Sequence, residues 1–244
     1  MHDQVAPGRT ARKRERRSRE FVVAAQSIIA EEGFEGLTMS RLARQLDTVD
    51  SAVYRYFSSK GALIAEIQKD AIERLTASLD GVRERADDAI SAAGLDDRTA
   101  ATTRLLLVGR WLCAASQSYF EEVRLLQMIM SHRQTTLDPE GGLRILPIAM
   151  ELLTRAVVAI EEAQAVGAIE PGSGIDRAAL LAGALSGVLE GDDLEKYVPS
   201  LFGGTRLAQQ ANLDLLRGWG ADRVALTRAT ELIDEMATEG PLAT

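Results

Sequence analysis

Apolar residues recur every three to four positions along most of the chain, and no stretch alternates apolar and polar residues long enough to predict a strand. The first predicted helix places Phe21, Ala25 and Ile28 on one face. Gly33 follows as its stop, because glycine adopts the left-handed conformation at a helix end without a steric penalty. The predicted helices span residues 10–32, 39–46, 50–57, 60–88, 98–119, 121–133, 143–166, 175–191, 205–217 and 222–238. The pattern therefore predicts an all-α fold of nine to ten helices.

Two short helices near the N-terminus are separated by a turn at residues 47–49. Thr38 precedes the first of them, where its hydroxyl can accept a hydrogen bond from an orphan backbone N–H. In a helix-turn-helix the second helix lies in the DNA major groove, which is about 12 Å wide and accommodates one helix. Residues 50–57 can bury Val53 and Phe57 while their other face stays polar. This spacing predicts a three-helix, DNA-binding helix-turn-helix domain.

Charge is distributed unevenly along the chain. The net charge is −8, yet residues 9–19 hold seven cations and one acidic residue. A basic segment attached to an acidic body indicates a polyanionic partner for that segment alone. A solvated, frayed chain end has the same composition, so the charge pattern leaves both interpretations open. Residues 1–10 are expected to form a disordered basic arm.

The stretch from Phe21 to Ile67 resembles the DNA-binding domain of the TetR family of bacterial transcriptional regulators. Its most specific element is the run Val53-Tyr54-Arg55-Tyr56-Phe57, followed by Ser59-Lys60 and Leu63. A shorter segment, residues 162–167 with Ile175-Asp176, resembles the end of the central helix and the start of the dimerisation helix in that family. The resemblance implies a helix-turn-helix domain over residues 11–59 and a helical ligand-binding and dimerisation domain over residues 60–244. A helical hairpin without a nucleic-acid role is the competing interpretation of the N-terminal pattern.

The resemblance also implies which side chains contact DNA. Tyr54 and Lys60 occupy the positions that hold phosphates in the family, and the exposed face of the third helix reads the bases. The cations after residue 11 can reach the minor groove or the adjacent backbone. The implied DNA-contacting residues are Arg12, Arg16, Thr38, Ser40, Arg41, Asp50, Ser51, Ala52, Tyr54, Arg55, Tyr56 and Lys60.

The turn before the third helix departs from the family pattern. Asp47, Thr48 and Val49 stand where the family has glycine, an apolar residue and serine or threonine. Asp tolerates left-handed geometry, and Asp and Thr can cap a helix. Asp50 would repel phosphates unless it accepts a hydrogen bond from cytosine or caps the helix. These residues motivate an alternative, a helix-turn-helix relative that acts mainly through protein partners and binds DNA weakly.

The middle of the chain carries aromatic and methionine side chains on neighbouring predicted helices. Such residues are typical of adaptable apolar pockets, and the resemblance implies a small hydrophobic effector bound there. The expected ligand contacts are Trp111, Tyr119, Phe120, Met128, Leu146 and Met150. Ordinary core packing is the simpler interpretation of any one of these residues.

Small residues alternate with leucines in the predicted helix 175–191. Small side chains allow close approach of a second helix, and together with residues 224–236 this helix is expected to form a four-helix bundle across a two-fold axis. The expected interface residues are Leu181, Leu185, Val188, Leu189, Leu232 and Met236. A helix buried inside one chain has the same pattern, and the resemblance favours the homodimer.

Two histidines and a single cysteine leave little material for metal or nucleophilic catalysis, and the known catalytic and phosphate-binding motifs are missing from the sequence. No apolar run approaches the roughly 18 residues of a membrane span, and no secretory signal precedes the first helix. A cytoplasmic protein without cofactor, membrane partner or enzymatic activity is therefore expected. The sequence predicts a homodimeric repressor that binds a palindromic double-stranded DNA operator and is released by a hydrophobic small-molecule effector.

Overall fold

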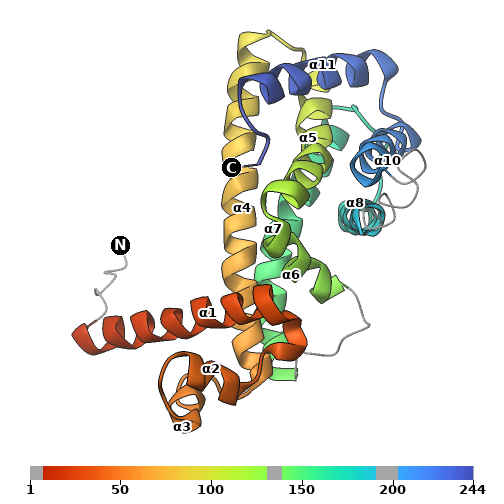
Figure 1. Ribbon diagram of the computed structural model, residues 1–244. Helices are drawn as coiled ribbons and strands as arrows, with labels where there is room; N and C mark the ends of the chain where they lie inside the picture. The colour runs from red at the N-terminus through yellow and green to blue at the C-terminus, as the bar shows by residue number, and fades with distance from the viewer. Residues whose placement is uncertain (1–7, 131–138, 191–202, 244) are drawn as a thin grey trace. The chain divides into compact units, whose positions relative to one another are not determined.

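The computed structural model describes residues 8–130, 139–190 and 203–243, and every regular element in these ranges is a helix. The helices are α1 (Arg9–Gly36), α2 (Met39–Gln45), α3 (Asp50–Tyr54), α4 (Lys60–Ala92), α5 (Asp97–Ser118), α6 (Phe120–Met130), α7 (Pro139–Ala165), α8 (Gly174–Leu189), α10 (Gly204–Gly218) and α11 (Arg223–Glu239) (Figure 1). The predicted all-α fold is confirmed.

The chain divides into two compact units. The N-terminal unit contains the described residues up to Asp70 and the start of α7 up to Leu146, and the C-terminal unit contains the rest. The domain boundary expected at residue 60 coincides with the start of α4, whereas the compact N-terminal unit continues to Asp70 inside that helix. Residues of α4 therefore belong to both units.

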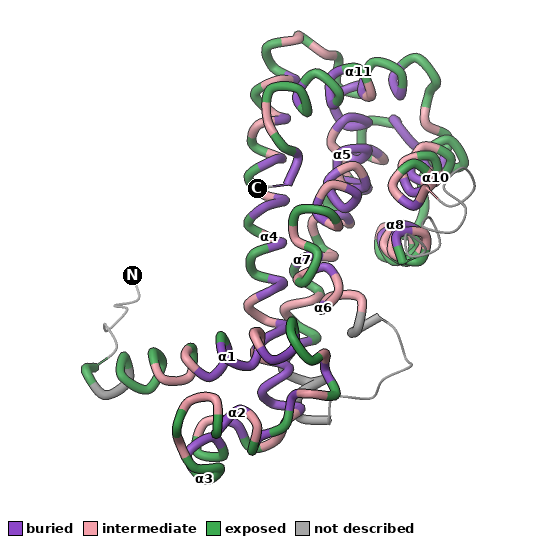
Figure 2. Tube along the Cα trace, viewed as in Figure 1, coloured by how far each residue is buried: buried purple, intermediate pink, exposed green. Residues whose placement is uncertain are grey.

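In the N-terminal unit, α1 is buried along its C-terminal half and exposed along its first turns (Figure 2). Phe21 and Ile28 are fully buried, as the helical period predicts. The Phe21 ring lies 5.2 Å from the Tyr56 ring and 6.3 Å from the Phe57 ring, measured between centroids. These contacts attach α1 to the segment after α3. Gly33 has φ 72°, so it provides the predicted left-handed stop, although Gly36 ends the element after this break.

The turn between α2 and α3 has the geometry that its residues allow. Asp47, which stands where the family has glycine, adopts the left-handed conformation with φ 48°. α3 ends at Tyr54, three residues earlier than predicted, and Phe57 N donates to Val53 O in the turn that follows. Val49 is the N-cap residue and makes no side-chain hydrogen bond. The expectation that an aspartate or threonine caps this helix is wrong, because the N-cap position belongs to an apolar residue.

The N-terminus of α2 is capped as predicted: Thr38 Oγ1 accepts a hydrogen bond from Arg41 N at 3.0 Å. Thr38→Ala is expected to lower the free energy of unfolding of the N-terminal unit by about 1 kcal/mol, because the N–H of Arg41 loses its acceptor. Urea unfolding of the DNA-free protein measures this change. Thr38→Ser keeps the hydroxyl and serves as the control, and equal stability of the two variants would contradict the role of the cap.

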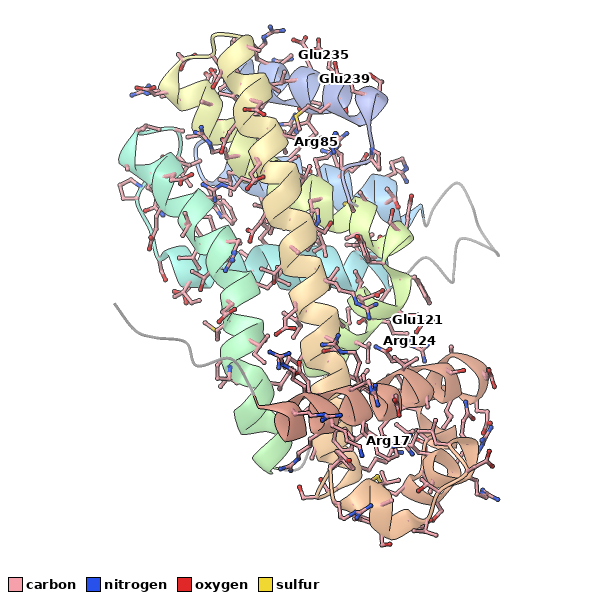
Figure 3. All side chains as sticks on the ribbon, turned by 90° about the vertical axis from the view of Figure 1, so that its left-hand side faces the viewer. Arg17, Arg85, Glu121, Arg124, Glu235 and Glu239 are labelled. Carbon is pink, nitrogen blue, oxygen red and sulfur yellow. The ribbon has the colours of Figure 1, made fainter. Side chains whose placement is uncertain are left out.

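In the C-terminal unit, α11 packs on α5, and α10 packs on α8 and α5. Polar contacts connect α4 to its neighbours. Trp111 Nε1 donates to Ser78 Oγ at 3.2 Å, and Arg85 Nη1 donates to Pro241 O at 2.7 Å, beside α11 (Figure 3). Asp96 caps α5, and hydrogen bonds from the hydroxyl and backbone N–H of Thr99 lower the pKa of its carboxyl.

Candidate DNA-binding surface and ligand pocket

The exposed face of α3 is polar. Ser51, Tyr54 and Arg55 lie exposed, and Tyr54 retains 52% of its accessible surface. The Arg55 side chain makes neither an ion pair nor a hydrogen bond with any residue in the described part of the chain. A guanidinium that is exposed and uncompensated is well suited to a phosphate or to the edge of a guanine base.

Ala52 does not belong to this face. Its side chain is only 7% exposed, so the expectation that it reads DNA is wrong. Successive residues of a helix are rotated by about 100°. In a helix of five residues, Ala52 and Val53 therefore share the inner side and leave the outer side to residues 50, 51 and 54.

Asp50 is bound within the protein. The Ser40 hydroxyl donates a hydrogen bond to its carboxylate and so connects α2 to the first turn of α3. The carboxylate is exposed, so its negative charge remains on the candidate surface. This contact gives Asp50 a structural role that requires no contact with a DNA base. It also engages the Ser40 hydroxyl, which was expected to reach DNA.

Two further candidate cations also make protein contacts. Arg41 Nη2 lies 2.7 Å from Glu32 Oε1, and Arg41 Nη1 donates to Gln45 Oε1 at 2.8 Å. Lys60 Nζ donates to Phe34 O at 3.0 Å. An ammonium group has three N–H donors, so this bond leaves donors of Lys60 for a phosphate. Arg41 is the more constrained of the two, because its charge is paired with Glu32 and its Nε, Nη1 and Nη2 each donate a hydrogen bond within the protein.

The N-terminal cations lie on a helix and not on an extended arm. Arg12 and Arg16 are exposed side chains of α1, whose first turns project beyond α2 and α3 (Figure 1). A helix is about 10 Å wide, and the minor groove is about 6 Å wide. The helix itself is therefore too wide to enter the minor groove, and contact would depend on its arginine side chains. That these cations reach the minor groove or the adjacent backbone stays a prediction.

The cations of α1 surround a hollow beside the end of α3. The hollow has a volume of about 570 Å³ and is lined by Lys13, Arg14, Arg16, Arg17, Glu20 and Tyr56. Arg17 is held in place, since its guanidinium lies 5.0 Å from the centroid of the Phe21 ring and its Nη1 donates to Glu20 Oε2 at 2.6 Å. A positively charged hollow next to exposed α3 residues extends the surface that can attract an anionic backbone.

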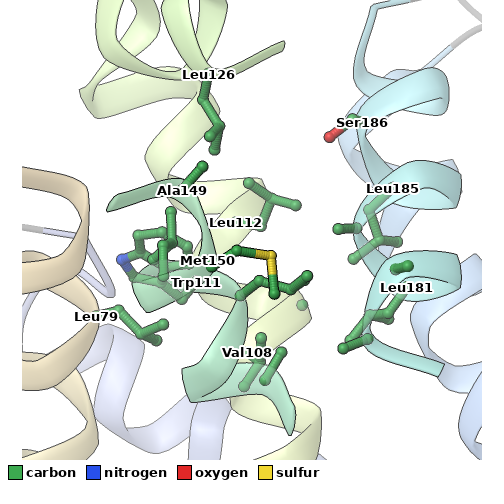
Figure 4. A pocket seen from close by; sticks show the side chains of 17 residues that line it. Leu79, Val108, Trp111, Leu112, Leu126, Ala149, Met150, Leu181, Leu185 and Ser186 are labelled. Carbon is green, nitrogen blue, oxygen red and sulfur yellow. The ribbon is translucent and has the colours of Figure 1, made fainter. Parts of the chain in front are cut away.

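The C-terminal unit contains an apolar pocket of about 180 Å³ (Figure 4). It is lined by Leu79, Val108, Gly109, Trp111, Leu112, Leu126, Ala149, Met150, Leu152, Leu153, Ala156, Ala178, Ala179, Leu181, Ala182, Leu185 and Ser186. Trp111 and Met150 were expected as ligand contacts and do line it. Tyr119, Phe120 and Leu146 do not line it, and the side chain of Met128 lies outside the described residues.

Solvent exposure explains why Phe120 and Leu146 do not line this pocket. Phe120 is 61% exposed and Leu146 is 56% exposed, so their large apolar side chains are not part of this pocket wall. The contribution of α8 was missed, because its leucines and alanines were assigned to a subunit interface. The small-residue spacing of α8 was the available signal, since alanines leave space for a ligand as well as for a second helix.

The expected dimer residues are largely buried inside one chain. Leu181, Leu185, Leu189, Leu232 and Met236 are at most 6% exposed, which corrects their assignment to an exposed interface, and Val188 is half-buried. The leucines of α8 repeat every four residues and form the inward stripe of the helix. Within the chain, α8 packs against α10, whereas α11 packs on α5. The expected bundle of α8 and α11 across a two-fold axis stays a prediction.

α8 does carry an exposed face of a different composition. Ala179, Leu180, Gly183 and Gly187 are exposed, at the three- and four-residue spacing of one side of a helix. A Cβ atom added at Gly183 or Gly187 would meet no atom within 4 Å. This face is apolar and smooth, and it remains uncovered among the described residues.

Comparison with known proteins agrees with this architecture. Residues 21–67 match the family model of bacterial regulatory proteins, tetR family. A putative TetR-family transcriptional regulator from Mesorhizobium loti superposes with a TM-score of 0.56 at 17% identity, over 84% of this chain and 96% of the other. Residues 21–67 are therefore similar to the DNA-binding domain of TetR-family regulators, and the fold is similar along most of the chain. In its described residues, the chain has no helix with the length and hydropathy needed to cross a membrane.

Other proteins are similar to parts of this chain. The nucleoid occlusion factor SlmA of Haemophilus influenzae is 37% identical over 70 residues, which cover 27% of this chain and 32% of SlmA. The chain thus matches about a third of the length of that curated relative. RolR, solved in complex with resorcinol, superposes with a TM-score of 0.56 at 18% identity, over 91% of this chain and 95% of RolR. The fold is therefore that of TetR-family transcriptional regulators along most of the chain.

Proposed function

We propose that this protein is a ligand-responsive transcriptional regulator that binds a palindromic DNA operator as a homodimer and is released from it by a hydrophobic small molecule. The observation that carries the proposal is the outer face of α3, where Tyr54 and Arg55 are exposed and free of described protein partners. Such a face supplies base and phosphate contacts once the helix lies in the major groove. The cations of α1 add contacts to the flanking backbone.

The dimer follows from the size of the reading helix. α3 has five residues and can contact only a few base pairs, so specific binding requires two copies on adjacent half-sites. The exposed face of α8, with Ala179, Gly183 and Gly187, supports close packing against a second copy across a two-fold axis. The buried leucines then stabilise each subunit, and the small exposed residues form the interface.

The pocket supports control by a small molecule. Its wall includes Leu79 on α4, and residues of α4 also belong to the N-terminal unit. A ligand that prefers one arrangement of α4 shifts the population of DNA-binding conformations by its differential affinity. RolR, which shares the fold, was solved with the small phenolic compound resorcinol bound, and this agrees with an effector of modest size.

Selection of random DNA by the purified protein tests the proposal directly. We expect a palindromic winner, bound with an affinity that falls steeply with salt concentration because several phosphates are neutralised. Anisotropy titrations of the winner at two salt concentrations measure this dependence. The control is the shuffled winner, which should bind at least 100-fold more weakly at moderate salt.

Failure of the selection would favour the alternative function. If no sequence is enriched above background, with or without small molecules, the helix-turn-helix acts mainly through protein partners. The Asp50 carboxylate, exposed beside the reading face, is the feature that would account for weak DNA binding.

A further inference from the structure

The composition of the pocket wall restricts the chemistry of the effector. Among the described residues, every side chain on the wall is apolar except that of Ser186, and none of these lining residues is ionisable. Trp111 carries a second polar atom, but its Nε1 already donates to Ser78 Oγ. A charged ligand would leave its hydration shell and find neither a counter-ion nor a set of hydrogen bonds, which is strongly unfavourable. The described wall therefore disfavours a ligand whose charged group lies inside the pocket.

The volume of the pocket restricts the size of the effector. About 180 Å³ is available to the ligand. An apolar protein cavity of about 150 Å³ accommodates one benzene molecule. The volume of the pocket therefore matches one ring, or two fused rings.

The arrangement of the wall favours a flat ring. Trp111 and Met150 lie on one side of the pocket, and Leu181 and Leu185 of α8 lie on the other (Figure 4). Aromatic rings stack favourably against an indole and make attractive contacts with a thioether sulfur. Ala178 and Ala182 add small side chains on the α8 side, which leaves room for a ring lying against the helix.

Ser186 supplies the single polar contact. Its Oγ points toward the group of pocket side chains in Figure 4, and it has no hydrogen-bond partner among the described residues. A hydroxyl both donates and accepts, so it can pair with one hydroxyl or N–H group of a ligand. A ligand with one such group satisfies the serine, and a second polar group would remain unpaired.

We propose that the effector is an uncharged aromatic compound of one or two rings with a single hydroxyl or N–H group, held between Trp111, Met150 and α8 and hydrogen-bonded to Ser186. This inference rests on the proposed function, because it assigns the chemistry of the ligand to the same effector pocket. The inference narrows the class of effector from hydrophobic small molecules in general to phenols and indoles.

Trp111 reports on binding directly. The chain has two tryptophans, and Trp219→Phe leaves Trp111 as the only tryptophan, whose fluorescence can be excited selectively over that of the tyrosines. Phenylalanine keeps a ring below the Arg177 guanidinium, which lies 5.3 Å from the Trp219 ring centroid. Titration of this variant without DNA should give saturable signals with phenol, indole and toluene. At pH 7 phenol is neutral, whereas benzoate and decanoate are ionised, and these two should bind at least 100-fold more weakly.

Two substitutions separate the ring site from the polar contact. Ser186→Ala should weaken phenol binding about tenfold and change toluene binding less than twofold, because only phenol loses a hydrogen bond. Ala182→Leu should weaken both at least tenfold by filling the pocket. Ala237→Leu, an exposed position on α11, is the matched control and should leave both unchanged.

Calorimetric titration of the unmodified protein with the same compounds provides a second measurement that does not depend on the fluorescent variant. Binding of benzoate or decanoate as tight as that of phenol would overturn the inference, and so would the lack of binding by all neutral rings. Phenol binding that leaves operator affinity unchanged would support the ligand class and overturn the release mechanism of the proposed function. Failure of DNA binding alone would leave the ligand titrations intact, so the two failures are distinguishable.

Discussion

Replacing Gly183 by glutamate is expected to convert the dimer into a monomer and to lower the affinity for a palindromic operator at least 100-fold. Gly183 lies on the exposed face of α8, and the proposed two-fold interface brings this face of both copies together. Two carboxylates brought into an apolar contact repel each other and lose hydration. Loss of one half-site removes the gain in avidity that comes from linking two weak contacts, which is commonly 100-fold or more.

The fold of the subunit should tolerate this change. A Cβ at Gly183 meets no atom within 4 Å, and replacement of a helical glycine raises helix propensity by up to about 1 kcal/mol. Light scattering at micromolar concentration measures the mass, and anisotropy measures operator affinity. Gly81→Glu is the control, because Gly81 is also an exposed helical glycine with open space around it, on α4. A Gly183→Glu protein that stays dimeric would contradict this interface, and a monomeric unmodified protein would contradict the dimer.

Charge reversal at Arg55 is expected to lower operator affinity at least 100-fold without changing thermal stability. The guanidinium is exposed and has no described protein partner, so its loss affects DNA and not the fold. In Arg55→Ala the slope of log affinity against log salt should decrease in magnitude by about two, because a dimer loses one phosphate contact in each half-site. In Arg55→Glu, repulsion by the backbone adds to this loss.

A matched charge reversal far from α3 distinguishes a local contact from a change in net charge. Arg223→Glu alters the charge by the same amount at an exposed position of α11, and its operator affinity should remain within about threefold of the unmodified protein. If both variants lost the same operator affinity, the effect of Arg55 would come from long-range electrostatics and not from a local contact with DNA. Lys60 is a less suitable probe, because Lys60 Nζ donates to Phe34 O and its removal also affects the stability of the N-terminal unit.

Local sequence signals were sufficient for the helices and for the cap of α2. Hydrophobic periodicity, Thr38 as a cap and Gly33 as a stop each act over a few residues, so they are readable without a tertiary structure. The length of α3 was overestimated, because its apolar spacing continues to Phe57 although the helix ends at Tyr54. The residue pattern of the DNA-binding domain was specific enough for the family to be recognised.

The tertiary structure alone decided which surface each helix shows to solvent and to its neighbours. The leucines of α8 fit an interface or a core equally well as a pattern, and their burial against the same chain assigns them to the core and the pocket. The engagement of Asp50 by Ser40 and the burial of Ala52 likewise depend on how α2 and α3 pack. The sequence by itself determined the elements, because they depend on neighbours a few residues apart. The ligand wall combines residues from five helices, and no local pattern specifies which of them meet.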